Sequence, residues 1–324
     1  MVPFKTIRSR RSVLVTGASG FVGRHVCALL SASGWKVTGL DRKLVALGTG
    51  CDGNAFQDFW TCDLRDPASV RRRRPSSPFD AIVHLAEQRP ESESLEALLA
   101  VNAGGTAALL DGLGGPQSHF VLLSTGRVYG HQRPPFREAM VSLPADPYAR
   151  SKVAAEAVAR ARCEILSAPL TILRPSVLYG RGAPPGTLFT ALFAALRRGE
   201  PFPMTIGEQT RDFLHVDDAA RALWVILEKA TVGTWNLASG RSWTVLAAAR
   251  LAAEVAGRAE LLRPGVLAGS PGDGFDHRLE GMALRRATGW YPRVDLLTGL
   301  RRLWAEPDPP SQPWPAPIAS TWAR

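Results

Sequence analysis

The fold class is decided by the stretch Val13-Leu14-Val15-Thr16-Gly17-Ala18-Ser19-Gly20-Phe21-Val22-Gly23. An apolar strand runs into a turn with three glycines, and a helical segment follows. Gly17 permits a tight turn, Gly20 lets backbone N–H groups approach a pyrophosphate, and Gly23 lets the helix pack close to the sheet. Because the helix N-terminus adds the positive end of a dipole, the stretch predicts a phosphate cradle for a dinucleotide. The candidate cofactor contacts in it are Gly17, Ser19, Gly20, Phe21, Val22 and Gly23.

Outward from this stretch, short β-branched runs alternate with alanine-rich helical segments. The alternation predicts an α/β fold with a parallel, doubly wound (Rossmann) sheet covered on both faces and joined by right-handed crossovers. We expect strands at 13–15, 36–40, 81–85, 120–124, 170–173 and 234–237, and helices at 23–31, 95–110, 148–166, 188–198, 219–229 and 245–256.

The character of the sequence changes after Pro175, where segments shorten and glycine and proline become frequent. This change predicts a smaller C-terminal substrate lobe. We expect residues 12–175, with about 212–240, to form the dinucleotide-binding domain. Residues 176–211 and 241–305 would form the substrate lobe, and the proline-rich residues 306–324 an irregular tail.

A carboxylate, Asp41, ends the second expected strand. At this place a carboxylate accepts hydrogen bonds from the adenosine ribose hydroxyls and repels a 2′-phosphate, so the pattern favours NAD over NADP. Arg42 and Lys43 follow at once and would instead suit a 2′-phosphate, which keeps NADP open. An Asp41 that only caps a turn is the alternative without a cofactor.

A Tyr-x-x-x-Lys spacing opens a long expected helix, at Tyr148 and Lys152. Residues four apart lie on one face of a helix. An ammonium group beside a phenol favours the phenolate and lowers the tyrosine pKa, so Tyr148 is a candidate general acid/base. By itself the spacing is more often a simple surface pair.

The strand that precedes this helix ends in Ser124 and Thr125, followed by Gly126 and Arg127. Active sites of open α/β sheets gather at the carboxyl ends of such strands. Either hydroxyl would suit a hydrogen bond to the reacting substrate oxygen, and Thr125 is the candidate catalytic partner of Tyr148. Turn capping is the alternative for both hydroxyls.

Together these features resemble the extended short-chain dehydrogenase/reductase family, and more specifically its NAD-dependent epimerase/dehydratase branch. The resemblance covers residues 12–304. It is carried by Thr16–Gly23, Asp63-Leu64, His84-Leu85-Ala86, Asn102 with Gly105-Thr106, Ser124-Thr125 before Val128-Tyr129-Gly130, Tyr148 with Lys152, Leu173-Arg174-Pro175-Ser176 with Tyr179-Gly180, Arg211-Asp212-Phe213-Leu214-His215-Val216-Asp217-Asp218, and Gly289-Trp290-Tyr291-Pro292-Arg293.

The resemblance implies further roles. Asp63 and Leu64 would flank the adenine, and Leu85 and Ala86 would line the pyrophosphate and nicotinamide side. Asn102 would lie behind the nicotinamide, Ser124 would belong to the cofactor site, and Lys152 would also bind the nicotinamide ribose. Arg211 would contact a substrate diphosphate, because a guanidinium fork matches phosphate oxygens, unless it forms a surface salt bridge instead.

Departures from the family pattern narrow the reaction. The family's 4,6-dehydratases usually carry Asp-Glu where Gly126 and Arg127 stand, so this sequence lacks the acid/base pair for eliminating water. Val177 replaces an asparagine that many epimerases direct at the substrate diphosphate. Ser270 stands in place of an arginine before Pro271-Gly272-Asp273, and Arg278 or Arg263 is the candidate substitute.

Three functions follow. The first is a sugar-nucleotide epimerase, acting at C4 by transient oxidation with bound NAD. The second is an NAD(P)H-dependent 4-ketoreductase that works on a 4-keto-6-deoxysugar nucleotide with the same residues. The third is a non-catalytic relative that binds nucleic acid or a regulatory partner. The intact set Thr125, Tyr148 and Lys152 argues against the third, and we expect no nucleic-acid partner.

Composition sets the remaining expectations. The 324 residues are 45% hydrophobic, enough for a sizeable core, and no apolar run is long enough to span a membrane. With no apolar signal core after the basic N-terminus, we expect a cytoplasmic protein. The net charge of +10 fits a solvated, arginine-rich surface or a phosphate-bearing substrate. The four cysteines lack metal-ligand spacing and are expected to be free thiols. The resemblance implies a homodimer joined through helices 95–110 and 148–166.

Overall fold

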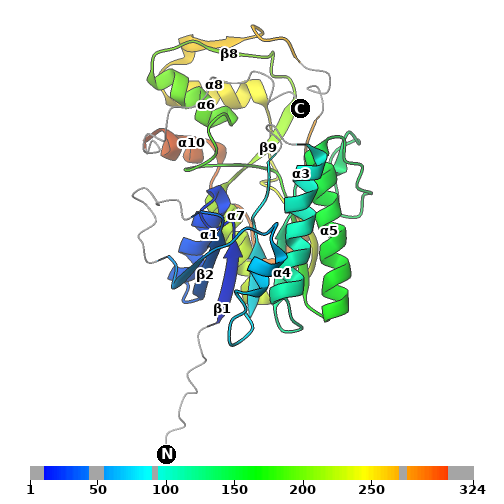
Figure 1. Cartoon of the computed structure of the whole chain (residues 1–324). Coiled ribbons are helices and arrows are strands. Elements are labelled where there is room, and N and C mark those ends of the chain that lie inside the picture. Colours follow the sequence, from blue (N-terminus) through cyan, green and yellow to red (C-terminus); the bar gives the residue numbers. More distant parts are fainter. Residues whose placement is uncertain (1–10, 44–54, 90–93, 270–275, 306–324) are drawn as a thin grey trace, which may run out of the picture.

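A seven-stranded, wholly parallel sheet forms the centre of the chain (Figure 1). The computed structural model describes residues 11–43, 55–89, 94–269 and 276–305. In spatial order the strands are β10 (Gly233–Leu237), β6 (Leu170–Pro175), β5 (His119–Leu123), β4 (Ala81–His84), β1 (Ser12–Thr16), β2 (Lys36–Asp41) and β3 (Asp58–Thr61). The chain builds outward from β1 to β3 and then returns to β4 on the other side of β1. This reversal places a crevice beyond the carboxyl ends of β1 and β4, where such sheets bind ligands.

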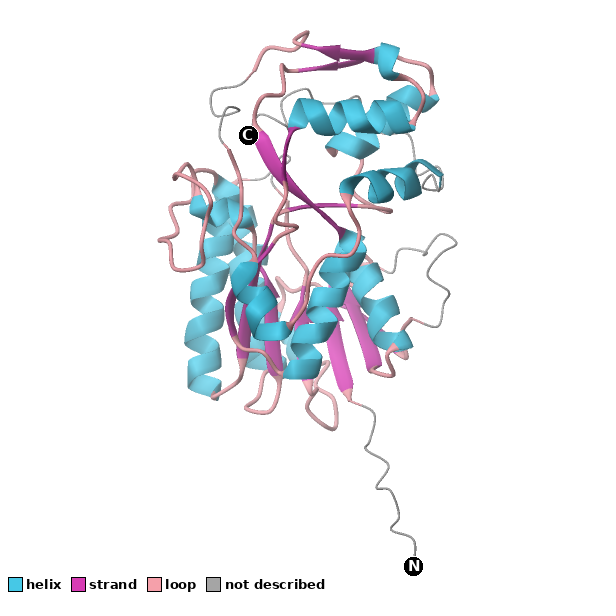
Figure 2. Cartoon of the chain, turned by 180° about the vertical axis from the view of Figure 1, so that it is seen from behind, coloured by secondary structure: helices cyan, strands magenta, loops and turns pink. Residues whose placement is uncertain are grey.

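The β1 residues show why both faces are covered. Val13 and Val15 point into the core under one helical layer, whereas Leu14 points into the core under the other, and all three are fully buried. This split is the two-residue period of a strand buried on both sides. One layer is made of α1 (Phe21–Ala32) and α7 (Val216–Lys229). The other is made of α2 (Pro67–Arg71), α4 (Gly105–Leu113) and α5 (Pro147–Leu166), and Figure 2 shows the helices from behind.

A second group of elements lies beyond the carboxyl ends of the strands (Figure 1). Its helices α6 (Leu188–Arg197), α8 (Val245–Val255) and α10 (Leu296–Ala305) share a separate apolar core. Its strands are β7 (Val177–Tyr179), β9 (Thr210–His215) and β11 (Ser242–Thr244), ordered β11-β9-β7, and the parallel pair β8 (Phe202–Met204) and β12 (Leu262–Pro264). Further short elements are the 3₁₀ turns η2 (Gly126–Tyr129) and η3 (Ala259–Leu261) and helix α9 (Met282–Thr288).

The Rossmann prediction is confirmed, with two differences along the sheet. Strand β3 was not expected, because its sequence Asp58-Phe59-Trp60-Thr61 has polar ends and only half-buried aromatic residues. The helix expected at 95–110 is not continuous. It consists of α3 (Leu95–Leu99), the π-helical turn η1 (Ala100–Gly104) and α4. A π-turn adds a residue within a helix and is frequent at functional sites.

Helix α5, which carries the Tyr-x-x-x-Lys pair, has a well-defined start. The Asp146 side chain accepts a hydrogen bond from the backbone N–H of Ala149, and Pro147 takes the first helical position, where no N–H is needed. The helix ends at Ser167 in the left-handed conformation. Its first turn therefore has a fixed orientation above the end of β5.

Candidate active site

The glycine loop after β1 fits closely against the end of β4. Gly17 has φ +66°, and a Cβ atom there would lie 2.8 Å from the backbone nitrogen of Ala86. The Ala86 N–H in turn donates to Thr16 Oγ1 at 3.2 Å. A Cβ at Gly23 would collide with the backbone of Gly17, so helix α1 can begin here only with glycine. The tight turn and the close packing of the helix start fit the predicted pyrophosphate cradle.

Asp41 stands at the carboxyl end of β2 and is held by the same loop. Its Oδ2 accepts a hydrogen bond from the Ser19 backbone at 3.1 Å, and its Oδ1 accepts one from the Arg42 backbone at 2.7 Å. The carboxylate therefore lies beside the glycine loop, as a ribose-binding carboxylate does in a dinucleotide fold. These residues fit a dinucleotide. The Ser19 hydroxyl donates to the carbonyl of Lys43, and Arg42 is exposed, so its role beside a 2′-phosphate stays a prediction.

The two residues of the predicted catalytic pair both donate hydrogen bonds to a third residue, Glu87. The Tyr148 hydroxyl donates to Glu87 Oε2 at 2.7 Å, and Lys152 Nζ donates to the same oxygen at 3.2 Å. Lys152 Nζ also donates to the carbonyl of Leu123 at 2.6 Å, which fixes the ammonium group at the end of β5. Arg89 lies 3.3 Å from the other oxygen, Glu87 Oε1. The Glu87 side chain is only 20% exposed, so the phenol and the ammonium group face each other across a largely buried carboxylate.

This carboxylate reverses the expected electrostatics of Tyr148. The sequence predicted that Lys152 would lower the tyrosine pKa, and that prediction is wrong for the geometry seen here. Burial, and then the charge and hydrogen bond of Glu87, raise the pKa of Tyr148 well above its usual value. Burial alone would raise the pKa of Glu87, but the charges of Lys152 and Arg89 outweigh it and lower that pKa. At neutral pH the phenol is therefore protonated and the carboxylate ionised.

The π-helical turn η1 positions the loop that carries Glu87. Asn102 lies in this turn and is 2% exposed. Its Oδ1 accepts a hydrogen bond from the Gln88 backbone at 2.8 Å, and its Nδ2 donates to Ser151 Oγ at 2.8 Å. Asn102 thus connects the residue after Glu87 to the helix of Tyr148 and Lys152. Its predicted place behind the nicotinamide stays a prediction, but its link between these two segments is seen directly.

The two hydroxyls at the end of β5 differ in their partners. Ser124 is buried, and its hydroxyl donates to Glu156 Oε1 at 2.6 Å. Thr125 is 9% exposed, and its Oγ1 accepts a hydrogen bond from the Arg127 backbone at 3.3 Å. Within the described residues the Thr125 hydroxyl donates no hydrogen bond, so Thr125 is the better placed of the two to act with Tyr148. Ser124 as a cofactor contact stays a prediction.

Arg127 covers Tyr148, the predicted acid/base. Its guanidinium carbon lies 5.5 Å from the centre of the Tyr148 ring, and its Nη2 is 2.9 Å from Asp146 Oδ2. Asp146 therefore caps helix α5 with one oxygen and holds Arg127 over Tyr148 with the other. A cation over the face of an aromatic ring is attracted to it. Position 127, which lacks the acidic residue of the dehydratases, therefore holds a cation fixed against Tyr148.

The remaining predicted contacts are spread around the same edge of the sheet. Asp63 is bound by Arg65, with Nη2 to Oδ2 at 2.7 Å, and the hydrogen bonds and charge of Arg65 lower the pKa of Asp63 although burial acts to raise it. Leu64 is buried against Gly105, and Leu85 is 9% exposed. Arg211 is the second residue of β9 and donates to the Thr210 carbonyl, whereas the Arg278 guanidinium lies 3.8 Å from Asp276. The substrate and adenine roles of these residues stay predictions.

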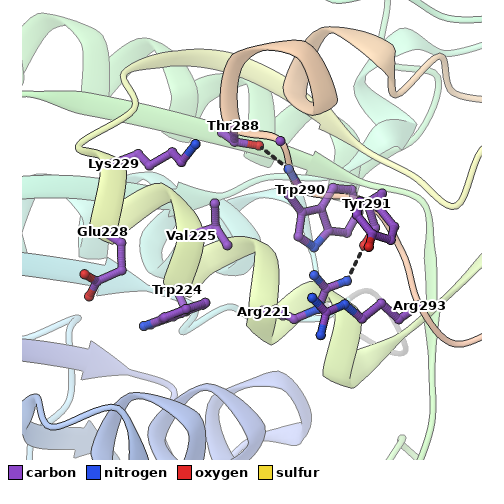
Figure 3. Close-up of a pocket in the computed structure, with 10 residues that line it drawn as sticks. Arg221, Trp224, Val225, Glu228, Lys229, Thr288, Trp290, Tyr291 and Arg293 are labelled. Carbon is purple, nitrogen blue, oxygen red and sulfur yellow. Dashed lines mark hydrogen bonds between the residues drawn. The ribbon is translucent and has the colours of Figure 1, made fainter.

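A surface cavity of about 440 Å³ lies elsewhere on the molecule (Figure 3). Helix α7 forms one wall and the turn after α9 forms the other, where Arg221 donates to the Tyr291 carbonyl. None of the predicted catalytic residues lines it, so it has no part in the proposed chemistry. The lining residues are Arg221, Trp224, Val225, Glu228, Lys229, Thr288, Gly289, Trp290, Tyr291 and Arg293.

Within the described residues, the other expectations have simple outcomes. No group of three or more His, Cys, Asp or Glu side chains could hold a metal ion, and no helix is long and apolar enough to cross a membrane. Cys27, Cys62 and Cys163 are buried free thiols, and Cys51 falls outside the described residues. The expected tail at 306–324 also lies outside them.

Sequence reasoning missed two residues at this site. Glu87 directly follows the predicted contact Ala86 at the end of a buried strand, and a carboxylate there was a usable signal. His277 packs its ring against Gly126, where a Cβ would lie 2.9 Å from His277 Cε1. No local pattern pointed to His277, because it is far from Gly126 in the sequence and follows no strand that was expected.

Comparison with known proteins places this geometry in a family. The sequence profile of the NAD dependent epimerase/dehydratase family matches residues 13–238. The dTDP-glucose 4,6-dehydratase of Xanthomonas campestris pv. campestris (strain B100) is 31% identical over 245 residues, covering 69% of this chain and 70% of that protein. The dTDP-4-dehydro-6-deoxy-D-allose reductase of Streptomyces bikiniensis is 29% identical over 290 residues, covering 81% of this chain and 86% of that protein.

A solved structure gives the same result over nearly the whole chain. The UDP-glucose 4-epimerase from Thermotoga maritima, crystallised with UDP-glucose, superposes with a TM-score of 0.81 at 26% identity, covering 90% of this chain and 96% of that one. The family match, the glycine cradle and the Tyr148–Lys152 pair agree with one another, and they confirm the predictions of an enzyme and of its cofactor class. The chain belongs to the NAD-dependent epimerase/dehydratase family, within the extended short-chain dehydrogenases/reductases, and is an NAD-dependent enzyme.

Proposed function

We propose that this enzyme is a sugar-nucleotide epimerase that inverts C4 of the sugar with bound NAD. The observation that carries the proposal is the meeting of Tyr148 and Lys152 at Glu87, directly beside the loop that packs on Gly17. The Tyr148 phenol, a proton-transfer group, and the Lys152 ammonium group therefore lie next to the predicted dinucleotide cradle. The similarity to a UDP-glucose 4-epimerase over 90% of the chain supports the choice of reaction.

The chain's own groups account for the proton chemistry. Tyr148 exchanges a proton with the oxygen on C4, while Thr125 shares a hydrogen bond with that oxygen. Lys152, fixed by the Leu123 carbonyl, supplies positive charge beside the phenol and would bind the nicotinamide ribose. When bound, NAD would supply the reversible hydride transfer at C4. Arg211 and Arg278 would hold the substrate diphosphate from the edge of the second lobe.

A dehydratase is disfavoured by the turn after β5, although relatives carry that name. Elimination of water across two sugar carbons needs an acid and a base on the substrate side of the site. The positions after Thr125 hold Gly126 and Arg127, and Arg127 is bound to Asp146. Glu87, the carboxylate closest to Tyr148 in the described site, is engaged by Lys152 and Arg89. An ionised carboxylate held by two cations is a poor proton donor.

A second candidate function is a 4-ketoreductase, and the protonation of Tyr148 favours it. Reduction of a ketone needs a proton donor at its oxygen, and the raised pKa keeps Tyr148 protonated at neutral pH. The 29% identity to a dTDP-4-dehydro-6-deoxy-D-allose reductase over 81% of the chain supports the same reaction. Under this proposal the residues act once, in one direction, with NAD(P)H.

Product analysis on purified protein separates these functions. UDP-glucose, dTDP-glucose and dTDP-4-keto-6-deoxyglucose are incubated with the enzyme and examined by NMR, mass spectrometry and the near-ultraviolet absorbance of the nicotinamide. An epimerase produces a C4 epimer of unchanged mass without net loss of that absorbance. A reductase consumes NAD(P)H in equal amount to the keto sugar, and a dehydratase releases one water per sugar. Inactivity on all three sugar nucleotides and on a wider panel of them would refute the proposal.

We also propose a homodimer through α3–α4 and α5. These helices pack together on one face of the sheet, with apolar side chains of α4 and α5 in the same core. Ile165 on α5 is 73% exposed, which leaves an apolar side chain on the outer face of this pair. Light scattering of the purified protein tests the proposal, and a monomer mass at micromolar concentration would contradict it.

A further inference from the structure

The segment 276–280 crosses from the second lobe to the turn that carries Thr125. The His277 backbone N–H donates to the Thr210 carbonyl at 3.1 Å, beside the start of β9. Two residues on, Leu279 pairs with Phe136 in a short parallel bridge. Backbone contacts on both sides therefore fix where His277 stands.

The imidazole of His277 is held between two surfaces. The Phe136 ring meets it edge-on, with centroids 5.2 Å apart and planes at 75°. On the other side lies Gly126, the residue after Thr125, where a Cβ would come within 2.9 Å of His277 Cε1 and 3.0 Å of a Leu279 methyl group. The ring thus occupies the space that any side chain at position 126 would need.

One nitrogen of this ring is left without a partner. His277 Nε2 is buried and has no hydrogen-bond partner among the described residues. A buried polar atom without a partner costs about 1–3 kcal/mol, so it calls for an explanation. The backbone of Gly126 also acts on the ring, through a hydrogen bond that raises the pKa of His277.

The charge state of the ring follows from its surroundings. Burial, and then the positive charge of Arg211, lower the pKa of His277 to about 4. Together with a smaller effect of Arg127, they outweigh the Gly126 hydrogen bond, which raises this pKa. The imidazole is therefore neutral at neutral pH. A neutral imidazole carries its proton on one nitrogen, and in the tautomer with the proton on Nδ1, Nε2 carries a lone pair and can accept a hydrogen bond.

We propose that His277 Nε2 accepts a hydrogen bond from a hydroxyl group of the sugar, and so fixes the sugar next to Thr125. The inference rests on the proposed function, because it takes the ligand to be a sugar nucleotide. A hydroxyl is the partner that a neutral acceptor requires, and the guanidinium groups of Arg127 and Arg211 near the ring suit a ligand that also carries a phosphate. His277 is thus a specificity-determining residue, not an acid or base.

This role also explains the glycine after Thr125. Alanine at position 126 would press on the ring, on Leu279 and on the Pro175 carbonyl, which lies 3.0 Å from the position of a Cβ. Because the last of these is backbone, the alanine cannot be accommodated by a side-chain movement alone. Position 126 has no acidic side chain because the His277 imidazole occupies the space that such a side chain would need.

The test compares sugar nucleotides with their nucleoside diphosphates. Calorimetric titration of the NAD-loaded enzyme with UDP-glucose, UDP, dTDP-glucose and dTDP gives the contribution of the sugar to binding. His277→Phe keeps the flat shape against Phe136 and removes the acceptor, whereas His277→Gln keeps an acceptor of similar reach. His119→Phe is the control. His119 is a buried histidine at the amino end of β5, hydrogen-bonded to Thr171 on the neighbouring strand, and so lies at the opposite end of the strands from Thr125.

We expect His277→Phe to weaken binding of the sugar nucleotide about 10-fold, the loss of one hydrogen bond, with binding of UDP or dTDP and of NAD unchanged. His277→Gln should restore part of the loss, and His119→Phe should show none once its folding is checked by thermal melting. If the wild-type enzyme binds sugar nucleotides and His277→Phe binds them equally well, the inference is overturned alone. If the wild-type enzyme binds no sugar nucleotide of a broad panel, the proposed function falls first and the inference with it.

Discussion

The Tyr148 hydroxyl donates a 2.7 Å hydrogen bond to Glu87, and Lys152 reaches the same carboxylate oxygen at 3.2 Å. The pair that defines the proposed chemistry is therefore a triad in this chain. A carboxylate next to a phenol stabilises the protonated phenol, whereas an ammonium group stabilises the phenolate. Burial, and then the charge and hydrogen bond of Glu87, shift the balance toward the protonated phenol.

Replacing Glu87 by Gln should lower the pKa of Tyr148. The amide removes the negative charge and the charged acceptor, both of which raise that pKa in the native chain. Oxidation of an alcohol needs the deprotonated tyrosine, so its activity should extend to lower pH than in the wild type. Reduction of a ketone needs the protonated tyrosine, so its activity should fall at a lower pH. Profiles of kcat/KM against pH in each direction measure both changes, and Glu138→Gln is the control. Unchanged profiles would show that Glu87 does not govern Tyr148.

Tyr148→Phe should abolish most of the turnover. Loss of a general acid/base typically costs about 10²- to 10⁴-fold in kcat, and the ring itself still packs under Arg127. NAD binding should stay near the wild-type value in a fluorescence titration. Lys152→Met should lose both turnover and cofactor affinity, because Lys152 also anchors the site to Leu123. Wild-type turnover in the phenylalanine variant would remove Tyr148 from the reaction.

Gly17→Ala should weaken cofactor binding. Its φ of +66° disfavours any side chain, and the added methyl group would lie 2.8 Å from the Ala86 backbone. Strain of about 1–3 kcal/mol and the displaced loop together predict at least about a 10-fold weaker NAD affinity. Gly115→Ala is the matched control, because the nearest atom to its Cβ position is 4.0 Å away. Calorimetry with NAD measures both variants, and equal affinities would contradict this account of the cradle.

Asp41→Ala should reduce the preference for NAD. The carboxylate is held toward the glycine loop by the Ser19 N–H, and its loss removes both the ribose acceptor and the repulsion of a 2′-phosphate. One charge-assisted hydrogen bond is worth about 1.5–3 kcal/mol, so the ratio of NAD to NADP affinity should fall about 10-fold or more. Mutating Arg42 to Ala in the same background should reverse any gain in NADP binding. A ratio that does not change would remove Asp41 from the cofactor site.

Glu156→Gln should destabilise the fold. Glu156 and Arg174 are each 5% exposed, with Arg174 Nη2 2.7 Å from Glu156 Oε2, and Ser124 also donates to this carboxylate. Breaking such a buried pair leaves a charge without its counterpart and typically costs about 3–5 kcal/mol. Urea unfolding of the variant measures the loss. Glu200→Gln at the exposed Arg198–Glu200 pair is the control and should show no measurable change.

The sequence was most informative where local backbone chemistry decides structure. The glycines of the cradle, the alternation of strands and helices and the cap of α5 each follow from short-range rules, and the central sheet could be predicted from them. Thr125 could be predicted from the end of its strand, and Tyr148 from its four-residue spacing to Lys152 on one helix. Strand β3 and the short strands of the second lobe could not be predicted, because packing between distant segments stabilises them.

Side-chain partners at the site were the least predictable part. The Tyr148–Lys152 spacing suggested a direct effect of the ammonium group on the phenol, but the partner between them comes from a different strand end. Glu87 reaches the pair because the loop after β4 is bound by Asn102. His277 reaches Gly126 through contacts with β9 and Phe136. Contacts of this kind depend on the tertiary structure, which cannot be derived from the local pattern of hydrophobic and polar residues.

The π-helical turn at Ala100–Gly104 makes the geometry of the site sensitive to the deletion of a single residue in this segment. Each residue advances a helix by about 100°, so the extra residue in this turn sets the rotation of Asn102 relative to the helix before it. A deletion of one residue here would restore regular helical hydrogen bonding and turn the amide of Asn102 away from Gln88 and Ser151. The shortened helix would be locally more regular, while the loop that carries Glu87 would lose its attachment to α5.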